Sequence, residues 1–350
     1  MNLYRAVKID GLELEGNLFL APVAGYTNRG FRSLCAEQGA NFSFTELVSA
    51  ESLYRNPGAY GLGAESNDNA KLRATSACLI RRAENEARYA VQLFSGDPDA
   101  LYKAALALAP LRPEALDINA GCPVPKVVKN GAGSALMKDP ALLGRIVQAA
   151  VRASREALGG APVTIKIRSG WDSASINYAL CARVAVEAGA AMISLHPRTR
   201  AQGYAGKSDW THIADLASRI SAPVAGSGDL FAPEDAARML AETGCAAVMF
   251  ARGAMGNPFI FRETRALLET GSFAPASLGE KLRAALRHVE LLCADIGERA
   301  ACLEMRGQFC AYLKGAQGAA AMREKATKAL AIADYQAVAE MAIDLGQTNP

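Results

Sequence analysis

The feature that most constrains this fold is a regular alternation of short apolar segments with longer helical patterns between residues 18 and about 255. Eight segments rich in apolar and β-branched residues are predicted strands: Leu18–Ala24, Phe42–Leu47, Tyr89–Phe94, Ala115–Asn119, Val163–Arg168, Met192–His196, Pro223–Ser227 and Ala247–Ala251. Stretches with helical spacing lie between most of them, as at 142–158, 176–188, 211–219 and 233–242. This alternation predicts a parallel sheet, and eight units favour an α/β fold of the closed (β/α)8 TIM-barrel type over an open doubly wound sheet.

The chain changes character after about residue 261. Only helical periodicity is present from 278 to 345, and the Gly-Ala-Gln-Gly turn at 315–318 separates two of the helices. A length of 350 residues suits a barrel of about 250 residues followed by a smaller unit. We therefore predict a catalytic barrel over residues 1–260 and a small all-α helical bundle over residues 261–350.

Composition and charge narrow the class of protein. The eight cysteines form no Cys-x-x-Cys pair and only three histidines are present, so we expect no metal site and reduced thiols in a cytoplasmic protein. No apolar run approaches the roughly 18 residues that span a bilayer, and residues 1–15 alternate like a hairpin, unlike a signal peptide. We expect a monomer without membrane association. The formal net charge of +3 permits a polyanionic partner without requiring one.

Catalytic residues of such barrels lie at the C-terminal ends of the strands. Here Cys122 follows the predicted strand at 115–119, where the apolar run breaks at Gly-Cys-Pro. No histidine is near in sequence, and a thiol with a pKa of about 8.5 is mostly protonated at neutral pH, which favours a proton donor over a nucleophile. The alternative is that Cys122 is a small buried apolar residue, as free cysteines often are.

Two further strand ends predict a phosphate site. Gly226–Asp229 follows the seventh strand and supplies glycines for close approach, while Arg252 follows the eighth and supplies bidentate donors.

Lys166 and Gln92 are polar residues within apolar strands. Lys166 is expected to point into the barrel toward an anion such as the edge of a reduced flavin, or to form a structural ion pair. The amide of Gln92 suits the edge of a pyrimidine-like ring.

His196 begins a loop in which cations alternate with an aromatic residue. Arg198, Arg200, Tyr204 and Lys207 follow it within twelve residues. Such interleaving suits a partner rich in phosphates and stacked bases, and a solvated basic loop is the alternative.

These motifs together resemble the tRNA-dihydrouridine synthases, most closely the bacterial B-type branch. The most specific are Asn-x-Gly-Cys-Pro at 119–123 and Arg-Thr-Arg-x-Gln-x-Tyr-x-Gly at 198–206. Further matching stretches are 20–32, 45–46, 91–93, 117–126, 131–136, 166–170, 196–207, 226–230, 252–258, 305–306 and 312–315. The resemblance implies an FMN-dependent barrel joined to a helical RNA-binding domain.

The resemblance also implies roles for individual residues. It places Pro22, Val23, Ala24, Gln92, Lys166, His196, Ser227, Gly228, Asp229, Ala251 and Arg252 around FMN, and makes Cys122 the proton donor. Candidate contacts with tRNA are Asn119, Arg198, Arg200 and Lys207. The chain departs from the family at Ser227, usually Asn, at Ala251, often Gly, and at Gly307-Gln308, often Lys-His.

The implied reaction is reduction of the C5=C6 bond of a uridine in the tRNA D-loop, with NADPH or NADH as electron donor. The residues agree with it, because this reduction needs a hydride, a proton and a base that has left its stack. One rival is a flavin barrel acting on a free pyrimidine, similar to dihydroorotate dehydrogenase, which would not need the C-terminal helices. Another is an RNA-binding protein without turnover, against which Cys122, Lys166 and Arg252 count.

Overall fold

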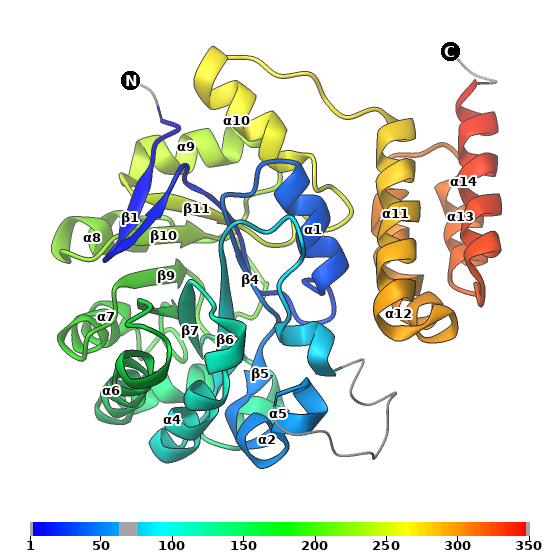
Figure 1. The fold of residues 1–350 in the computed structure, drawn as a ribbon. Helices are drawn as coiled ribbons and strands as arrows, with labels where there is room; N and C mark the ends of the chain where they lie inside the picture. Colours follow the sequence, from blue (N-terminus) through cyan, green and yellow to red (C-terminus); the bar gives the residue numbers. More distant parts are fainter. Residues whose placement is uncertain (1–2, 63–75, 348–350) are drawn as a thin grey trace.

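A computed structural model describes residues 3–62 and 76–347. Eight parallel strands form a closed barrel, because β11 pairs with β3 and β4 pairs with β6 (Figure 1). The strands are β3 (Leu18–Leu20), β4 (Phe42–Phe44), β6 (Tyr89–Phe94), β7 (Ala115–Ala120), β8 (Val163–Arg168), β9 (Met192–His196), β10 (Val224–Ser227) and β11 (Ala247–Phe250). The predicted TIM barrel is confirmed. A two-residue strand, β5 (Val48–Ser49), pairs in parallel with the C-terminal end of β6.

Strand alternation divides the apolar side chains between two layers. Residues such as Ile165 and Ile167 face the surrounding helices, while Phe19 and Met249 face the barrel interior. The N-terminal hairpin of β1 (Val7–Ile9) and β2 (Leu12–Leu14) was expected from its alternation. Its apolar side chains pack on the interior cluster at the N-terminal ends of the strands and close that end of the barrel.

Helices cover the outside of the barrel (Figure 1). They are α1 (Arg29–Glu37), α2 (Ala50–Arg55), α4 (Pro98–Ala107), α5 (Pro125–Val128), α6 (Pro140–Ala157), α7 (Tyr178–Glu187), α8 (Thr211–Arg219), α9 (Pro233–Thr243) and α10 (Ile260–Thr270). Several of these helices begin with a side chain that accepts a hydrogen bond from a backbone N–H of the first turn. For example, Asp139 accepts from the backbone N–H of Leu142 and Pro140 occupies the first helical position of α6. In the described part of the chain, no helix is both long and apolar enough to span a membrane.

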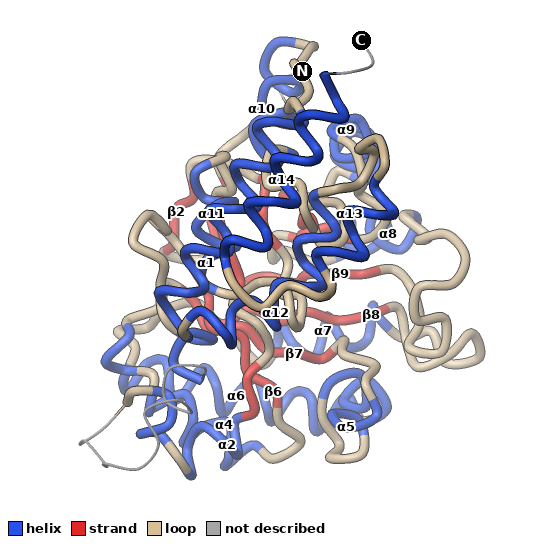
Figure 2. The backbone as a smooth tube through the Cα atoms, turned by 90° about the vertical axis from the view of Figure 1, so that its right-hand side faces the viewer, coloured by secondary structure: helices blue, strands red, loops and turns tan. Residues whose placement is uncertain are grey.

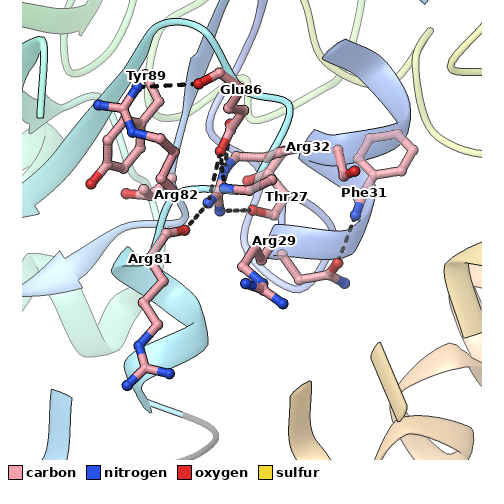
Figure 3. A network of polar contacts seen from close by, with 12 residues as sticks. Thr27, Arg29, Phe31, Arg32, Arg81, Arg82, Glu86 and Tyr89 are labelled. Atoms are coloured by element: carbon pink, nitrogen blue, oxygen red, sulfur yellow. Dashed lines mark hydrogen bonds and ion pairs between the residues drawn. The ribbon is translucent and has the colours of Figure 1, made fainter. Parts of the chain in front are cut away.

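One buried ion pair ties the segment before β6 to α1 (Figure 3). Arg32 is fully buried, and its Nε donates to Glu86 Oε1 at 2.8 Å. Its remaining donors reach the backbone carbonyls of Thr27 and Arg81. The Glu86 carboxylate also accepts from the backbone N–H of Ala83 at 2.7 Å, so both charges are compensated.

The C-terminal helices form a second unit with its own core. They are α11 (Leu278–Ile296), α12 (Glu298–Tyr312), α13 (Ala319–Ala326) and α14 (Ile332–Gln347), and apolar residues from all four make one cluster. Ile260 and Phe261 of α10 still belong to the barrel core. The division at residue 260 stays a prediction.

The helical bundle lies against α1 (Figure 2). It also contacts the loops that follow β3 and β11. A Cβ at Gly256 would collide with the backbone of Ala311 in α12, so this contact requires a glycine. Arg29 pairs with Asp295 of α11 at 2.6 Å. The bundle therefore sits beside the C-terminal face of the barrel, next to the edge where the predicted site lies.

Candidate functional site

A cavity of about 260 Å³ opens at the C-terminal ends of the strands. Its lining includes every residue predicted to surround the cofactor: Pro22, Val23, Ala24, Gln92, Lys166, His196, Ser227, Gly228, Asp229, Ala251 and Arg252. Cys122 and Asn119 line it as well. Seven strands and the loops after them thus bring together residues that are up to about 230 positions apart in sequence.

One end of the cavity is cationic and contains a glycine that no other residue can replace without strain. Gly228 has a φ of 112°, and a Cβ there would collide with the hydroxyl of Ser208. Asp229 pairs with Arg198 at 2.7 Å and with Arg252 at 3.0 Å. The guanidinium of Arg252 also lies 4.5 Å from the ring centroid of Tyr204. This end can therefore hold an anion close to the backbone.

Lys166 projects from β8 into the interior, since its neighbours Ile165 and Ile167 face the outer core. Among the described residues no carboxylate lies within ion-pair distance of its ammonium, which leaves the cation available to a ligand in the cavity. Burial, together with the charge of Arg168, lowers the pKa of Lys166 to about 8. His196 is neutral, because burial and then the surrounding cations lower its pKa to about 2.

Cys122 is half-buried in the cavity wall. Burial raises the pKa of its thiol above the ordinary value, so the thiol keeps its proton at neutral pH. The loop around it is held at several points. The backbone N–H of Cys122 donates to Asn119 Oδ1 at 2.9 Å, and the carbonyl of Cys122 accepts from the N–H of Ser134 at 3.0 Å.

The three basic residues of the loop after β9 lie in different environments. Arg198 is 2% exposed, and besides Asp229 it donates to the carbonyls of Ala205 and Gly206. Its donors are thus engaged beneath the cavity, an arrangement that does not favour contact with tRNA. Arg200 is half-buried, 4.6 Å from the ring of Trp171, and Lys207 is exposed. Neither of these two lines the cavity.

Several residues in or beneath the cavity wall have no role predicted from the sequence. Asp117 is fully buried below Gln92, and the guanidinium of Arg168 lies in the wall and donates to the carbonyls of Gly121, Thr199 and Gly203. Asp117 and Arg168 were detectable as charged residues within apolar strands. Phe231, which is 49% exposed at the mouth, has no comparable signal, because a single aromatic residue in a loop is common.

Comparison with known proteins identifies the family. A model described as dihydrouridine synthase (Dus) matches residues 19–345. The chain belongs to the dihydrouridine synthase family. A "Probable tRNA-dihydrouridine synthase" of Treponema pallidum (strain Nichols) is 47% identical over 341 residues, which cover 96% of each chain. "tRNA-dihydrouridine synthase B" of Pseudomonas aeruginosa is 37% identical over 315 residues, which cover 89% of each.

The fold of this family member also has neighbours among solved structures. An old yellow enzyme homologue from Zymomonas mobilis superimposes with a TM-score of 0.52 at 11% identity and covers 80% of this chain and 96% of its own. At this identity the likeness concerns the fold alone. It agrees with the barrel described above.

Proposed function

We propose that this member of the family is an FMN-dependent tRNA-dihydrouridine synthase. It would reduce the C5=C6 bond of a uridine in the tRNA D-loop, with NADPH or NADH as electron donor. The observation that carries the proposal is a single cavity that joins a protonated thiol, Cys122, to a cationic cradle at the ends of β10 and β11. The names of the similar proteins support the substrate class.

The residues present fit FMN. Arg252 and the backbone at Gly228 and Asp229 would hold its phosphate, with Ser227 and Ala251 beside them. Lys166 and Gln92 would hold the polar edge of its ring, and Pro22–Ala24 would line the ring through their backbone. FMN held by these residues would supply the hydride for the reduction. His196, neutral and close to these cations, would add a hydrogen bond without adding charge.

Cys122 would hold the proton that uridine receives. Two observations support this role: burial raises the pKa of the thiol, which keeps it protonated, and Cys122 lines the cavity that the base would enter. Arg200 and Lys207 would contact the tRNA backbone from the loop after β9. Arg198 would act through Asp229, and Asn119 would line the pocket of the base.

Other parts of the proposal concern the protein as a whole. We place the catalytic barrel at residues 1–260 and the tRNA-binding helical bundle at 261–350, in a monomeric cytoplasmic enzyme. The bundle lies beside the mouth of the cavity, where a tRNA bound to it would be in reach of Cys122.

Two measurements test the proposal. The cofactor released by denaturing the purified protein should be FMN, and finding FAD, or no flavin after reconstitution, would refute that part. Nucleoside analysis of tRNA from cells with and without the gene should then show loss of dihydrouridine at a defined position. Turnover with free uracil or orotate, and none with tRNA, would favour the free-pyrimidine rival.

A further inference from the structure

A buried carboxylate, to which the proposed reaction gives no role, lies beneath the lining of the cavity. Strand register places Asp117 of β7 between Gln92 of β6 and Thr164 of β8. Its Oδ2 accepts from Gln92 Nε2 at 2.6 Å, and its Oδ1 accepts from the Thr164 hydroxyl. Because an ionised carboxylate only accepts hydrogen bonds, Gln92 must turn its NH2 group toward Asp117.

The hydrogen bonds continue from Gln92 to the loop that carries the thiol. Gln92 Oε1 accepts from Asn119 Nδ2 at 2.8 Å. Asn119 Oδ1 then accepts from the backbone N–H groups of Gly121 at 3.2 Å and Cys122 at 2.9 Å. Each side-chain amide has a donor on one side and an acceptor on the other, so the orientation of one decides that of the next.

We infer that Asp117 is a positioning residue whose carboxylate sets the direction of both amides and thereby holds Asn119 as a clamp on the backbone of Cys122. The importance of the clamp for catalysis rests on the proposed function, whereas the clamp itself does not. If Gln92 rotated by half a turn, its NH2 would meet the NH2 of Asn119. Asn119 would then have to turn its own donor toward two backbone donors. The carboxylate at position 117 excludes this arrangement from one end of the chain of amides, and the backbone N–H groups of Gly121 and Cys122 oppose it from the other.

Removing the acceptor tests the inference directly. Asp117→Leu should increase the rate of amide hydrogen exchange in the segment 119–124 by about tenfold, which corresponds to the loss of about one hydrogen bond. Exchange in α6 and in the helical bundle should stay unchanged. Thr164→Val is the matched control, because it removes the other hydrogen bond of Asp117 and leaves the bond to Gln92. In turnover, Asp117→Leu should lower kcat and leave the KM for tRNA unchanged.

A second test exchanges the carboxylate and the amide between positions 117 and 119. It tests the direction of the hydrogen bonds through Gln92, and it does not depend on a single variant that folds poorly. In Asn119→Asp alone, a carboxylate oxygen at position 119 faces Gln92 Oε1, so two acceptors face each other without a proton between them. If Gln92 rotates, its Oε1 instead faces the carboxylate of Asp117, and two acceptors again meet. Adding Asp117→Asn provides a donor at position 117, so a rotated Gln92 can donate to the new carboxylate. We expect fast exchange at 119–124 in the single variant and exchange within about threefold of wild type in the double variant, as for a restored hydrogen bond.

Either of two results would overturn the inference. One is wild-type exchange at 119–124 in Asp117→Leu, and the other is a double variant that exchanges as fast as Asn119→Asp alone. Exchange is measured on the protein without tRNA. It therefore decides the positioning role separately from turnover, and a wild-type protein that forms no dihydrouridine would instead refute the proposed function.

Discussion

The cavity and the joint between barrel and bundle, by which we mean the buried contacts of Asn28 with His288 and Gln308, are both built on buried hydrogen bonds. They differ in whether the side chains that make these bonds are charged. The cavity gathers ionisable groups, among them Lys166, whose pKa lies at about 8. At the joint, Asn28 Oδ1 accepts from His288 Nε2, whose Nδ1 accepts from the Tyr312 hydroxyl. Burial lowers the pKa of His288 to about 3, so the ring is neutral and its two nitrogens need opposite roles.

The difference follows from what each region has to contact. Gln308 completes the joint by accepting from Asn28 Nδ2 and donating to the carbonyl of Gly25, so neutral donors and acceptors satisfy each other within the protein. In the cavity, Lys166 is left for an outside partner. Charged groups at the contact between barrel and bundle, such as Arg29 and Asp295, pair with each other, whereas the cavity leaves the charge of Lys166 for a ligand to neutralise.

The largest expected effect concerns the thiol in the cavity. Cys122→Ala should slow tRNA reduction by about 100- to 10,000-fold, the usual contribution of general acid catalysis, while FMN binding and reduction by NADPH remain. Cys122→Ser should be nearly as slow, because a hydroxyl is a weaker acid. Flavin reoxidation after anaerobic mixing with dihydrouridine-free tRNA measures this. Cys293→Ala, at a half-buried thiol of the bundle, is the control. Reoxidation at the wild-type rate in Cys122→Ala would show that the proton comes from elsewhere.

The next effect concerns the cationic end of the cavity. Arg252→Ala should weaken FMN binding by about 2 kcal/mol, roughly 30-fold, because a charged donor is lost from its partner. Titration of the apoprotein, followed by flavin fluorescence, measures the Kd. Arg183→Ala on α7, an exposed arginine in an ion pair with Glu187, should leave the Kd unchanged. An unchanged Kd in Arg252→Ala would place the phosphate elsewhere.

At the joint, the expected effect is on stability and not on the cofactor. Gln308→Ala should reduce the free energy of unfolding by about 1–2 kcal/mol, since it removes the donor to the carbonyl of Gly25 and one acceptor of the Asn28 NH2. Gly307→Ala is a close control, because a Cβ there meets no atom within 4 Å. Urea unfolding measures both. A Gln308→Ala variant that loses FMN affinity but not stability would contradict the contrast between the two regions.

The smallest effect is expected in the loop after β9. The double variant Arg200→Gln with Lys207→Gln should bind tRNA a few-fold more weakly and lower the salt slope by about 1 to 2, as for two lost phosphate contacts. Its flavin content should be normal. Arg198→Gln should behave oppositely and lose FMN, because Arg198 supports Asp229. Arg152→Gln with Arg183→Gln, on the outer helices, controls for net charge. An unchanged slope would count against this loop as an RNA contact.

The sequence predicted the barrel well because most of the parallel strands are apolar on their outer faces, as at Ile165 and Ile167, and repeat in regular alternation with helices. It predicted the basic loop less well. Arg198 and Arg200 are neighbours in sequence, but Arg198 turns inward to Asp229, which is 31 positions away. The sequence did not predict the role of Gln308, because its partners Asn28 and Gly25 lie about 280 positions earlier and leave no local pattern.

The N-terminal hairpin has a consequence for the kinetics of the proposed reaction. Val7, Ile9 and Leu14 seal one end of the barrel, so the cavity has its entrance at the other end. The electron donor and the tRNA would then use the same opening in turn, since both must reach one cofactor. Steady-state rates measured at several fixed tRNA concentrations should give parallel double-reciprocal lines. The order of events at the enzyme would thus follow from six residues of short antiparallel hairpin on the opposite side of the molecule.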